Sequence, residues 1–267
     1  MVRRQERRAG FTLIELLLAM AVFLVICGAM FSLLQLSQQR YSSETQLSGS
    51  FQEARLAMDQ IVRDVNDAGF PSAGMFSKLP VSTSYAIGPV AWWPNYPTSP
   101  CIVGSTCNPS PGDFDLIIET SLQTPTGPVL TWIRYQLVGT TLMRGSIAKN
   151  GTDPIGATSG PGVMVPFLVN VMNNAMNSSP AQFAQITASY PSMFPGGNPV
   201  PIFQYSCETP TAVVSCTNVN AGAYNTAVNI RDVDITLIVM TQLPDAQTQQ
   251  IKLIELNGRG HRLNPAN

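Results

Sequence analysis

The stretch GFTLIELLLAMAVFLVICGAMFSLL, residues 10–34, holds one charged side chain, Glu15, in an otherwise uncharged apolar run. The 19 residues from Leu16 to Leu34 carry no charge, and a helix of about 20 apolar residues spans a bilayer. An unpaired carboxylate in hydrocarbon costs on the order of a few kcal/mol. The sequence therefore predicts a membrane-spanning helix in which Glu15 needs a partner.

The residues before this run are basic. MVRRQERRAG, residues 1–10, contains four arginines and one glutamate, which gives a net charge of +3. Basic residues that precede a membrane span stay in the cytoplasm. In a secretory signal, a small-residue cleavage site follows the apolar stretch, whereas here Ala9-Gly10 precedes it. We therefore expect a single-pass membrane protein with a cytoplasmic N-terminus and an exported head, not an ordinary secretory signal.

The segment RRAGFTLIE, residues 7–15, closely resembles the class III signal of type IV prepilins and type II secretion pseudopilins. The resemblance implies that residues 1–10 are a leader peptide, cut between Gly10 and Phe11 on the cytoplasmic side. The implied enzyme is a prepilin peptidase/methyltransferase, which would also N-methylate Phe11. Glu15 would be the assembly residue. The other implied partners are major and minor pilins, membrane lipid and an inner-membrane assembly platform. The implied location is first the inner membrane and then a cell-surface or periplasmic filament.

Cleavage at this position would supply the partner that Glu15 needs. The new amine at Phe11 is positive, and two paired charges are tolerated in a low dielectric where one alone is not. In a packed filament, the Phe11 amine of one subunit could meet Glu15 of a neighbour and set the axial register. The alternative is a tolerated acid near a helix end that snorkels to the membrane interface. That alternative leaves Gly10-Phe11 unexplained.

The helix is predicted to continue beyond the bilayer. Residues 35–69 contain no proline, and their apolar positions recur every three or four residues, as on one face of an amphipathic helix. These positions are Leu47, Phe51, Ala54, Met58, Ile61 and Val65. A helix from Phe11 to Ala68 would be about 87 Å long. We divide it into a transmembrane half, residues 11–34, and an amphipathic half, residues 35–69, that packs on a sheet.

The segment ARLAMDQIVRDVNDAGF, Ala54–Phe70, resembles the pattern that follows the anchor in minor pilins of the W type and in J-type pseudopilins. Within this segment, the resemblance rests on Arg55-Leu56, Arg63-Asp64 and Ala68-Gly69-Phe70. Similar spacing occurs in other amphipathic helices, so the type of pilin is a finer inference than the family resemblance.

Residues 70–267 are expected to form a β-rich head with a single core. Alternating or apolar runs predict strands at 114–119, 129–138, 141–144 and 163–171, with a hairpin at Gly139, and a closing pair at 228–242 and 249–256. Proline and glycine predict loops with short strands over 71–112, and 173–197 reads as a long insertion. The resulting fold class is α+β: a pilin-like roll in which a long N-terminal helix lies across one antiparallel sheet.

Four of the five cysteines form two close pairs, Cys101/Cys107 and Cys207/Cys216, in segments rich in proline, serine and threonine. Neither pair has the spacing of a zinc site, so two local disulfides in an oxidising compartment are expected. The fifth, Cys27, lies in the apolar run and is read as a small core residue.

No catalytic motif appears in the sequence. The single histidine, His261, lies in a Gly-Arg-Gly-His-Arg stretch that reads as a solvated tail. Two acid pairs, Asp113/Asp115 and Asp232/Asp234, would each point one way on a strand and could bind calcium only with further oxygen ligands. We expect no enzyme activity, cofactor or metal, and no nucleic-acid partner, because basic residues do not cluster beyond the start.

Trp92-Trp93-Pro94 could contact a ligand, although aromatic residues in such a loop more often close the end of a core. Three functions therefore stay open. The first is a minor pilin or pseudopilin that initiates or caps a filament. The second is a filament-displayed adhesin that binds a surface, DNA or a sugar, and the third, disfavoured by the missing catalytic set, is a membrane-anchored enzyme.

Overall fold

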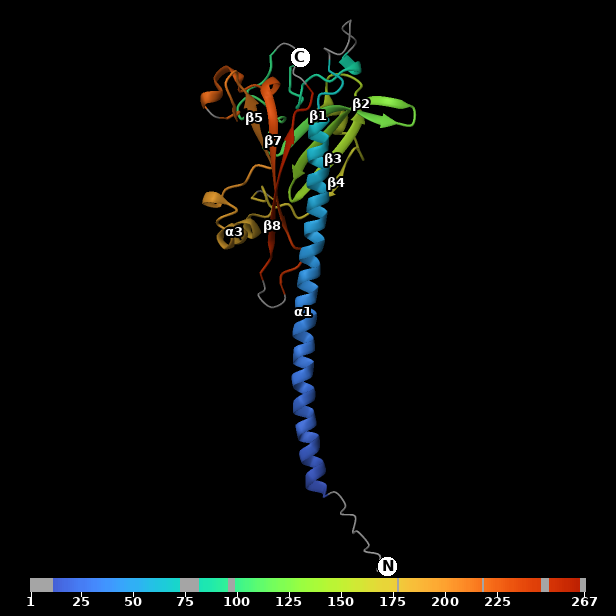
Figure 1. Ribbon diagram of the computed structural model, residues 1–267, viewed down its shortest axis with the longest axis vertical. Coiled ribbons are helices and arrows are strands. Elements are labelled where there is room, and N and C mark those ends of the chain that lie inside the picture. The colour runs from blue at the N-terminus through green and yellow to red at the C-terminus, as the bar shows by residue number, and fades with distance from the viewer. Residues whose placement is uncertain are drawn as a thin grey trace, which may run out of the picture.

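The structure is a computed structural model that describes residues 12–72, 82–95, 99–176, 178–217, 219–245 and 250–264. Its dominant element is α1 (Leu13–Asn66), a helix of 54 residues that projects far below the head (Figure 1). The helix ends two residues before the expected Ala68: Asp67 is its C-cap, and Gly69 has a φ of +79° that favours glycine. The expected start at Phe11 lies outside the described residues.

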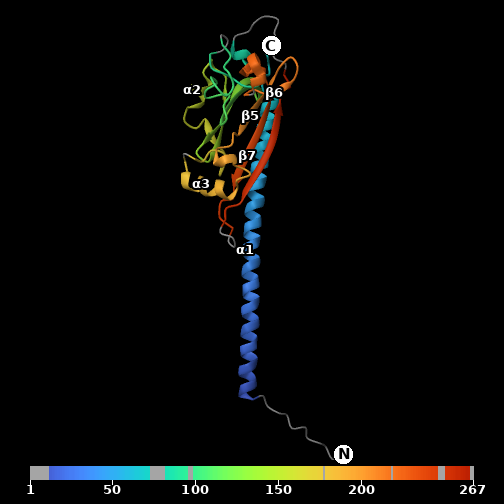
Figure 2. The same cartoon turned by 90° about the vertical axis from the view of Figure 1, so that its left-hand side faces the viewer.

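The head packs on one side of the C-terminal part of α1, and the other side of the helix stays uncovered (Figure 2). The α+β class is confirmed, but the single expected sheet is wrong, because the strands form two sheets of four. The first has the order β1-β2-β3-β4 and consists of Asp115–Thr124, Gly127–Val138, Thr141–Ala148 and Met164–Leu168. The second has the order β6-β5-β7-β8 and consists of Val213–Ser215, Phe203–Glu208, Ile230–Met240 and Leu253–His261.

The first sheet follows the sequence closely. The hairpin of β2 and β3 turns at Gly139, which has a φ of +62°, as the sequence predicts. β1 and β2 form a second hairpin through residues 124–127, and β4 completes the antiparallel sheet. Each of these strands pairs with a close neighbour in the chain, so local alternation and turn residues are enough to find them.

The second sheet contains two strands that were not predicted from the sequence, β5 and the short β6. β5 lies between β6 and β7, and its residues alternate buried and exposed from Phe203 to Cys207. The pattern is only six residues long and follows a proline-rich segment, so it gives a weak local signal. The pairing with β7, more than 20 residues later, establishes the strand.

The Gly-Arg-Gly-His stretch is not a solvated tail. It forms the end of β8, which pairs with β7 and packs against α1. Gly258 and Gly260 face the helix, where an added Cβ would lie 2.5 Å from Met58 Sδ and 2.4 Å from Val65 Cγ1. Arg259 and His261, on the opposite face of the strand, pair with Asp234 and Asp232 of β7. The alternation thus lets the helix lie directly on the backbone of β8.

The head has two apolar clusters instead of the single expected core. The larger joins the buried face of α1 to both sheets and contains the buried side chains of Trp92 and Trp93, so the structural interpretation of that loop is confirmed. The smaller lies beneath α3 (Pro180–Ser189), a helix within the expected insertion, and is centred on Phe183, Phe194 and Ile238. Further short helices are α2 (Pro154–Thr158) and the 3-10 turns Ser82–Ser84, Pro195–Gly197, Val219–Tyr224 and Ala227–Asn229.

Charged groups inside the first sheet are fully paired. Glu119 accepts hydrogen bonds from Trp132 Nε1 at 2.6 Å, from Lys149 Nζ at 3.0 Å and from the amide of Ile87 at 2.5 Å. Burial raises the pKa of Glu119 and lowers the pKa of Lys149. A lone charge in this position would be strongly destabilising, so these bonds fix the segment around Ile87 against β1.

Candidate functional site

The start of α1 gives Glu15 a partner within its own chain. Thr12 is the N-cap, and Glu15 Oε2 accepts hydrogen bonds from the Thr12 amide at 3.0 Å and from its hydroxyl at 2.9 Å. The Thr12 hydroxyl in turn accepts from the Glu15 amide at 3.4 Å, which completes a capping box. Gly10 and Phe11 lie outside the described residues. In the single subunit, the Glu15 carboxylate therefore helps to cap the start of the helix and has hydrogen-bond partners there.

Within the described residues, nothing covers the most apolar part of α1. Its most apolar window has a mean hydropathy of 2.7, and none of that window is buried in the structure. In the described residues, this is the one helix long and apolar enough to cross a membrane. Ser32, the single hydroxyl from Leu16 to Leu34, donates to the carbonyl of Gly28 at 3.0 Å, so it is satisfied without water. Such a surface can be covered by lipid or by neighbouring helices.

A polar contact fixes the helix to the head below the main interface. Ser43 of α1 donates to Asp245 Oδ2 at 2.6 Å, and the two residues are 202 positions apart. Lys252 Nζ lies 2.8 Å from the same carboxylate oxygen and donates to Ser43 Oγ at 3.1 Å. Residues at the two ends of the connection between β7 and β8 therefore hold the helix nine residues beyond Leu34. No local sequence pattern predicts this contact.

A second polar group joins the helix to the first sheet. Asp64 of α1 is buried and accepts from Tyr135 Oη at 2.5 Å and from Arg144 at 2.8 Å. Burial and the nearby Asp64 carboxylate raise the pKa of Tyr135 well above its ordinary value. Tyr135 therefore stays a neutral hydrogen-bond donor, and the helix is fixed in rotation as well as in position.

The four head cysteines form disulfides in the expected local pairs. The Cys101–Cys107 sulfurs are 1.95 Å apart and the Cys207–Cys216 sulfurs 2.03 Å apart. Cys27 is a free cysteine in α1 and half-buried, not a core residue of the head.

Loss of either disulfide should weaken the head without preventing its folding. Short loops limit the gain, so C101S/C107S or C207S/C216S should each lower the free energy of unfolding by roughly 2–3 kcal/mol. Denaturant unfolding of the full chain, followed by the fluorescence of its head tryptophans, measures this loss. The variant C27A is the control and should leave the transition unchanged. Non-reducing peptide maps that found cross-pairing between the two sets would contradict the assignment.

The two acid pairs do not form metal sites in the described part of the chain. Asp115 is held by Arg134, with Nη2 2.6 Å from Oδ2, Asp232 by His261 and Asp234 by Arg259. Within that part, no group of three or more histidine, cysteine or carboxylate residues is close enough to hold a metal ion. His261, bound through Nδ1 to Asp232, serves the β7–β8 pairing.

Comparison with known proteins supports the N-terminal assignment. Residues 6–31 match the family model described as the prokaryotic N-terminal methylation motif. The match begins in the basic segment, includes Gly10, Phe11 and Glu15, and runs into the uncovered part of α1. No curated protein and no solved structure matches the chain. The chain thus carries a methylation motif of the type IV pilin-like kind, joined to an α+β head.

Proposed function

We propose that this chain is a minor pilin or pseudopilin, a low-abundance subunit that helps to initiate or cap a type IV pilus or a related filament. The observation that carries the proposal is the continuity of the methylation motif at residues 6–31 with an apolar helix that its own head leaves uncovered. A helix of this kind can first sit in the inner membrane and later pack among the helices of other pilins. The resemblance of Ala54–Phe70 to W-type minor pilins and J-type pseudopilins supports the minor role.

The proposal includes an order of processing, export and assembly for the chain. The prepilin peptidase/methyltransferase removes residues 1–10 and methylates Phe11, while the arginines keep the start of the chain in the cytoplasm. The head folds outside, where its disulfides persist. The inner-membrane platform then passes the subunit into a surface or periplasmic filament. The subunit acts as a structural component, not as an enzyme.

A deletion strain tests this function. Loss of an initiating subunit should strongly reduce the number of surface filaments or the secretion that depends on them, and re-expression should restore it. Mass spectrometry of sheared filaments from the parent strain should find this protein at low abundance, beginning at methylated Phe11. An intact MVRRQERRAG leader in filaments would contradict the processing step. Normal filament number with lost attachment would instead favour the displayed adhesin.

A further inference from the structure

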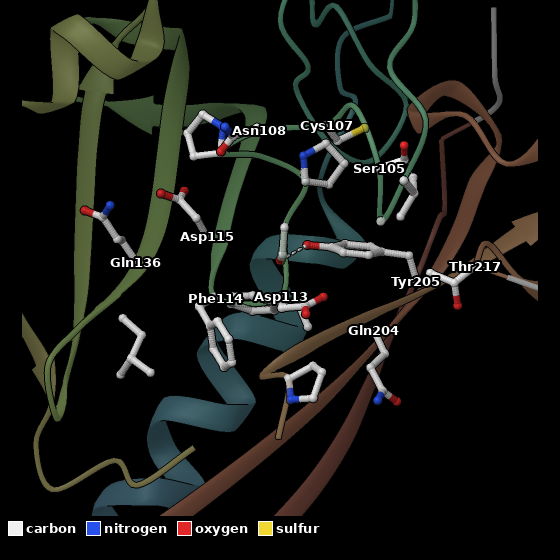
Figure 3. A pocket seen from close by; sticks show the side chains of 18 of the residues that line it. Ser105, Cys107, Asn108, Asp113, Phe114, Asp115, Gln136, Gln204, Tyr205 and Thr217 are labelled. Atoms are coloured by element: carbon white, nitrogen blue, oxygen red, sulfur yellow. Dashed lines mark hydrogen bonds between the residues drawn. The ribbon is translucent and has the colours of Figure 1, made fainter. Parts of the chain in front are cut away.

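A cleft opens in the head where the two sheets meet, apart from the N-terminal half of α1. It has a volume of about 780 Å³, within the roughly 300–1,000 Å³ range of small-molecule sites. Its walls come from the loop before β1, the end of β2, the start of β5 and the segment after β6 (Figure 3). Gly112 and Tyr205, which are 93 positions apart, both line the cleft, so it exists only in the folded head.

The disulfides stabilise two of these walls. Cys107 itself lines the cleft, and Ser215 and Thr217, on either side of Cys216, line it from the other sheet. The first disulfide loop also approaches the residue that follows the second disulfide, because a Cβ on Gly104 would lie 2.8 Å from Thr217 Cγ2. Walls fixed in this way lose little freedom when a ligand binds.

The floor of the cleft is held rigid as well. Tyr205 is buried, and its hydroxyl donates to the carbonyl of Gly112 at 2.8 Å (Figure 3). The Asp113 carbonyl accepts from the amides of Ile202 and Phe203 at 2.9 and 3.0 Å. The backbone that carries Asp113 is therefore tied to β5 independently of its side chain.

The Asp113 side chain is the charged group in this cleft that is available to a ligand. It is exposed, and in the described part of the chain no hydrogen bond or ion pair joins its carboxylate to another residue. Desolvation by the neighbouring cleft residues nevertheless raises the pKa of the Asp113 carboxyl. Asp115, the other lining acid, is already bound to Arg134. Among the described residues that line the cleft there is no lysine, arginine or histidine, so they offer no cation to a phosphate or a nucleic-acid backbone.

The remaining lining groups are neutral donors, acceptors and apolar rings. Gln204 and Asn108 supply amides, Ser105 supplies a hydroxyl, and all three side chains are exposed. Phe114 and three prolines supply the apolar surface. A carboxylate and amides suit ligand hydroxyl groups that must both donate and accept, and aromatic and proline rings can cover the C–H faces of a sugar.

We propose that this cleft binds a short neutral saccharide, with Asp113 and Gln204 as its main polar contacts. The ligand hydroxyls donate to the Asp113 carboxylate, and the Gln204 amide forms hydrogen bonds with the neighbouring oxygens of the ligand. Because a single chain supplies all of these lining residues, the site does not depend on the proposed role in assembly.

Binding of the full chain to an array of neutral mono-, di- and trisaccharides tests the site, in a detergent whose headgroup carries no sugar. Saccharides that bind are then titrated by calorimetry. Asp113→Asn should weaken binding about tenfold or more, because a hydrogen bond to a charged acceptor is among the stronger polar contacts. Gln204→Ala removes neutral hydrogen bonds and should weaken binding about threefold to tenfold. Asp59→Asn, an exposed acid on α1, is the matched control and should bind as the wild type does.

Each result of this binding experiment either supports the saccharide site or overturns it. Saccharide binding that the two cleft variants lose and the control keeps supports the site, provided that all variants unfold at the same temperature. If no saccharide on the array binds, or if Asp113→Asn and Gln204→Ala bind as well as the wild type, the proposal is overturned. A trilysine peptide serves as the competing probe. Binding of that peptide without any saccharide would also overturn the proposal and identify the cleft as a site for cationic peptides.

Discussion

Glu15→Ala should leave the protein cleaved and in the membrane fraction, yet reduce its amount in sheared filaments at least tenfold. Removal of a membrane charge makes insertion equal or slightly easier, and the head, which does not contact Glu15, should fold unchanged. In the filament, the Phe11 amine of a neighbour would be buried without a partner, at a cost of several kcal/mol before relaxation. About 1.4 kcal/mol already corresponds to a factor of ten.

The capping box calls for a second variant at the same position. Because Glu15 also accepts from Thr12 at the helix start, Glu15→Ala removes a cap as well as a charge. Glutamine can serve in a capping box in place of glutamate, so Glu15→Gln keeps the cap and loses the charge. If the charge governs assembly, both variants should be excluded from filaments. Normal entry of Glu15→Gln would show that the cap is what matters.

The control for this experiment lies on the same helix. Glu44 is an exposed acid beyond the membrane-spanning stretch, and Glu44→Ala should enter filaments normally. The measurement is a fractionation of each strain, blotted for this protein, with a count of surface filaments. Unchanged incorporation of Glu15→Ala would remove Glu15 as the assembly determinant and favour the snorkelling interpretation.

Gly260→Ala should destabilise the head by about 1–3 kcal/mol, the usual cost of overpacking a close contact. The added Cβ would lie 2.4 Å from Val65 Cγ1 and 2.7 Å from Val65 Cβ. Val65 is fully buried and β-branched, so its side chain cannot change rotamer to make room for the added Cβ. The larger Gly260→Val should cost more and detach the end of β8 from α1.

Gly258 provides the matched comparison. An added Cβ there would meet Met58 Sδ at 2.5 Å, but a flexible thioether can move at little cost. Gly258→Ala should therefore be clearly less destabilising than Gly260→Ala, although both residues face the same helix. Denaturant unfolding of the full chains, read by tryptophan fluorescence, measures the difference. Equal midpoints for Gly260→Ala and the wild type would show that the helix does not lie on the β8 backbone.

The sequence predicted those features whose signals are local. The apolar run and the periodic half of α1 need only neighbouring residues, and the observed end at Asn66 lies close to the expected one. The β2–β3 hairpin follows from Gly139 between two apolar runs, and each disulfide closes a separation of six or nine residues. The methylation motif is likewise contiguous, so the family resemblance could be recognised from residues 7–15.

The remaining features exist only in the tertiary structure. The head divides into two sheets because β5 pairs with β7 across a long connection, and no local pattern records that choice. The stretch that contains Gly258 and Gly260 was predicted to be a solvated tail, because the contact with α1 that requires these glycines exists only in the folded chain. The contact of Ser43 with Asp245 and the cleft around Asp113 join residues far apart in the chain. Their geometry follows from packing, which the sequence alone does not display.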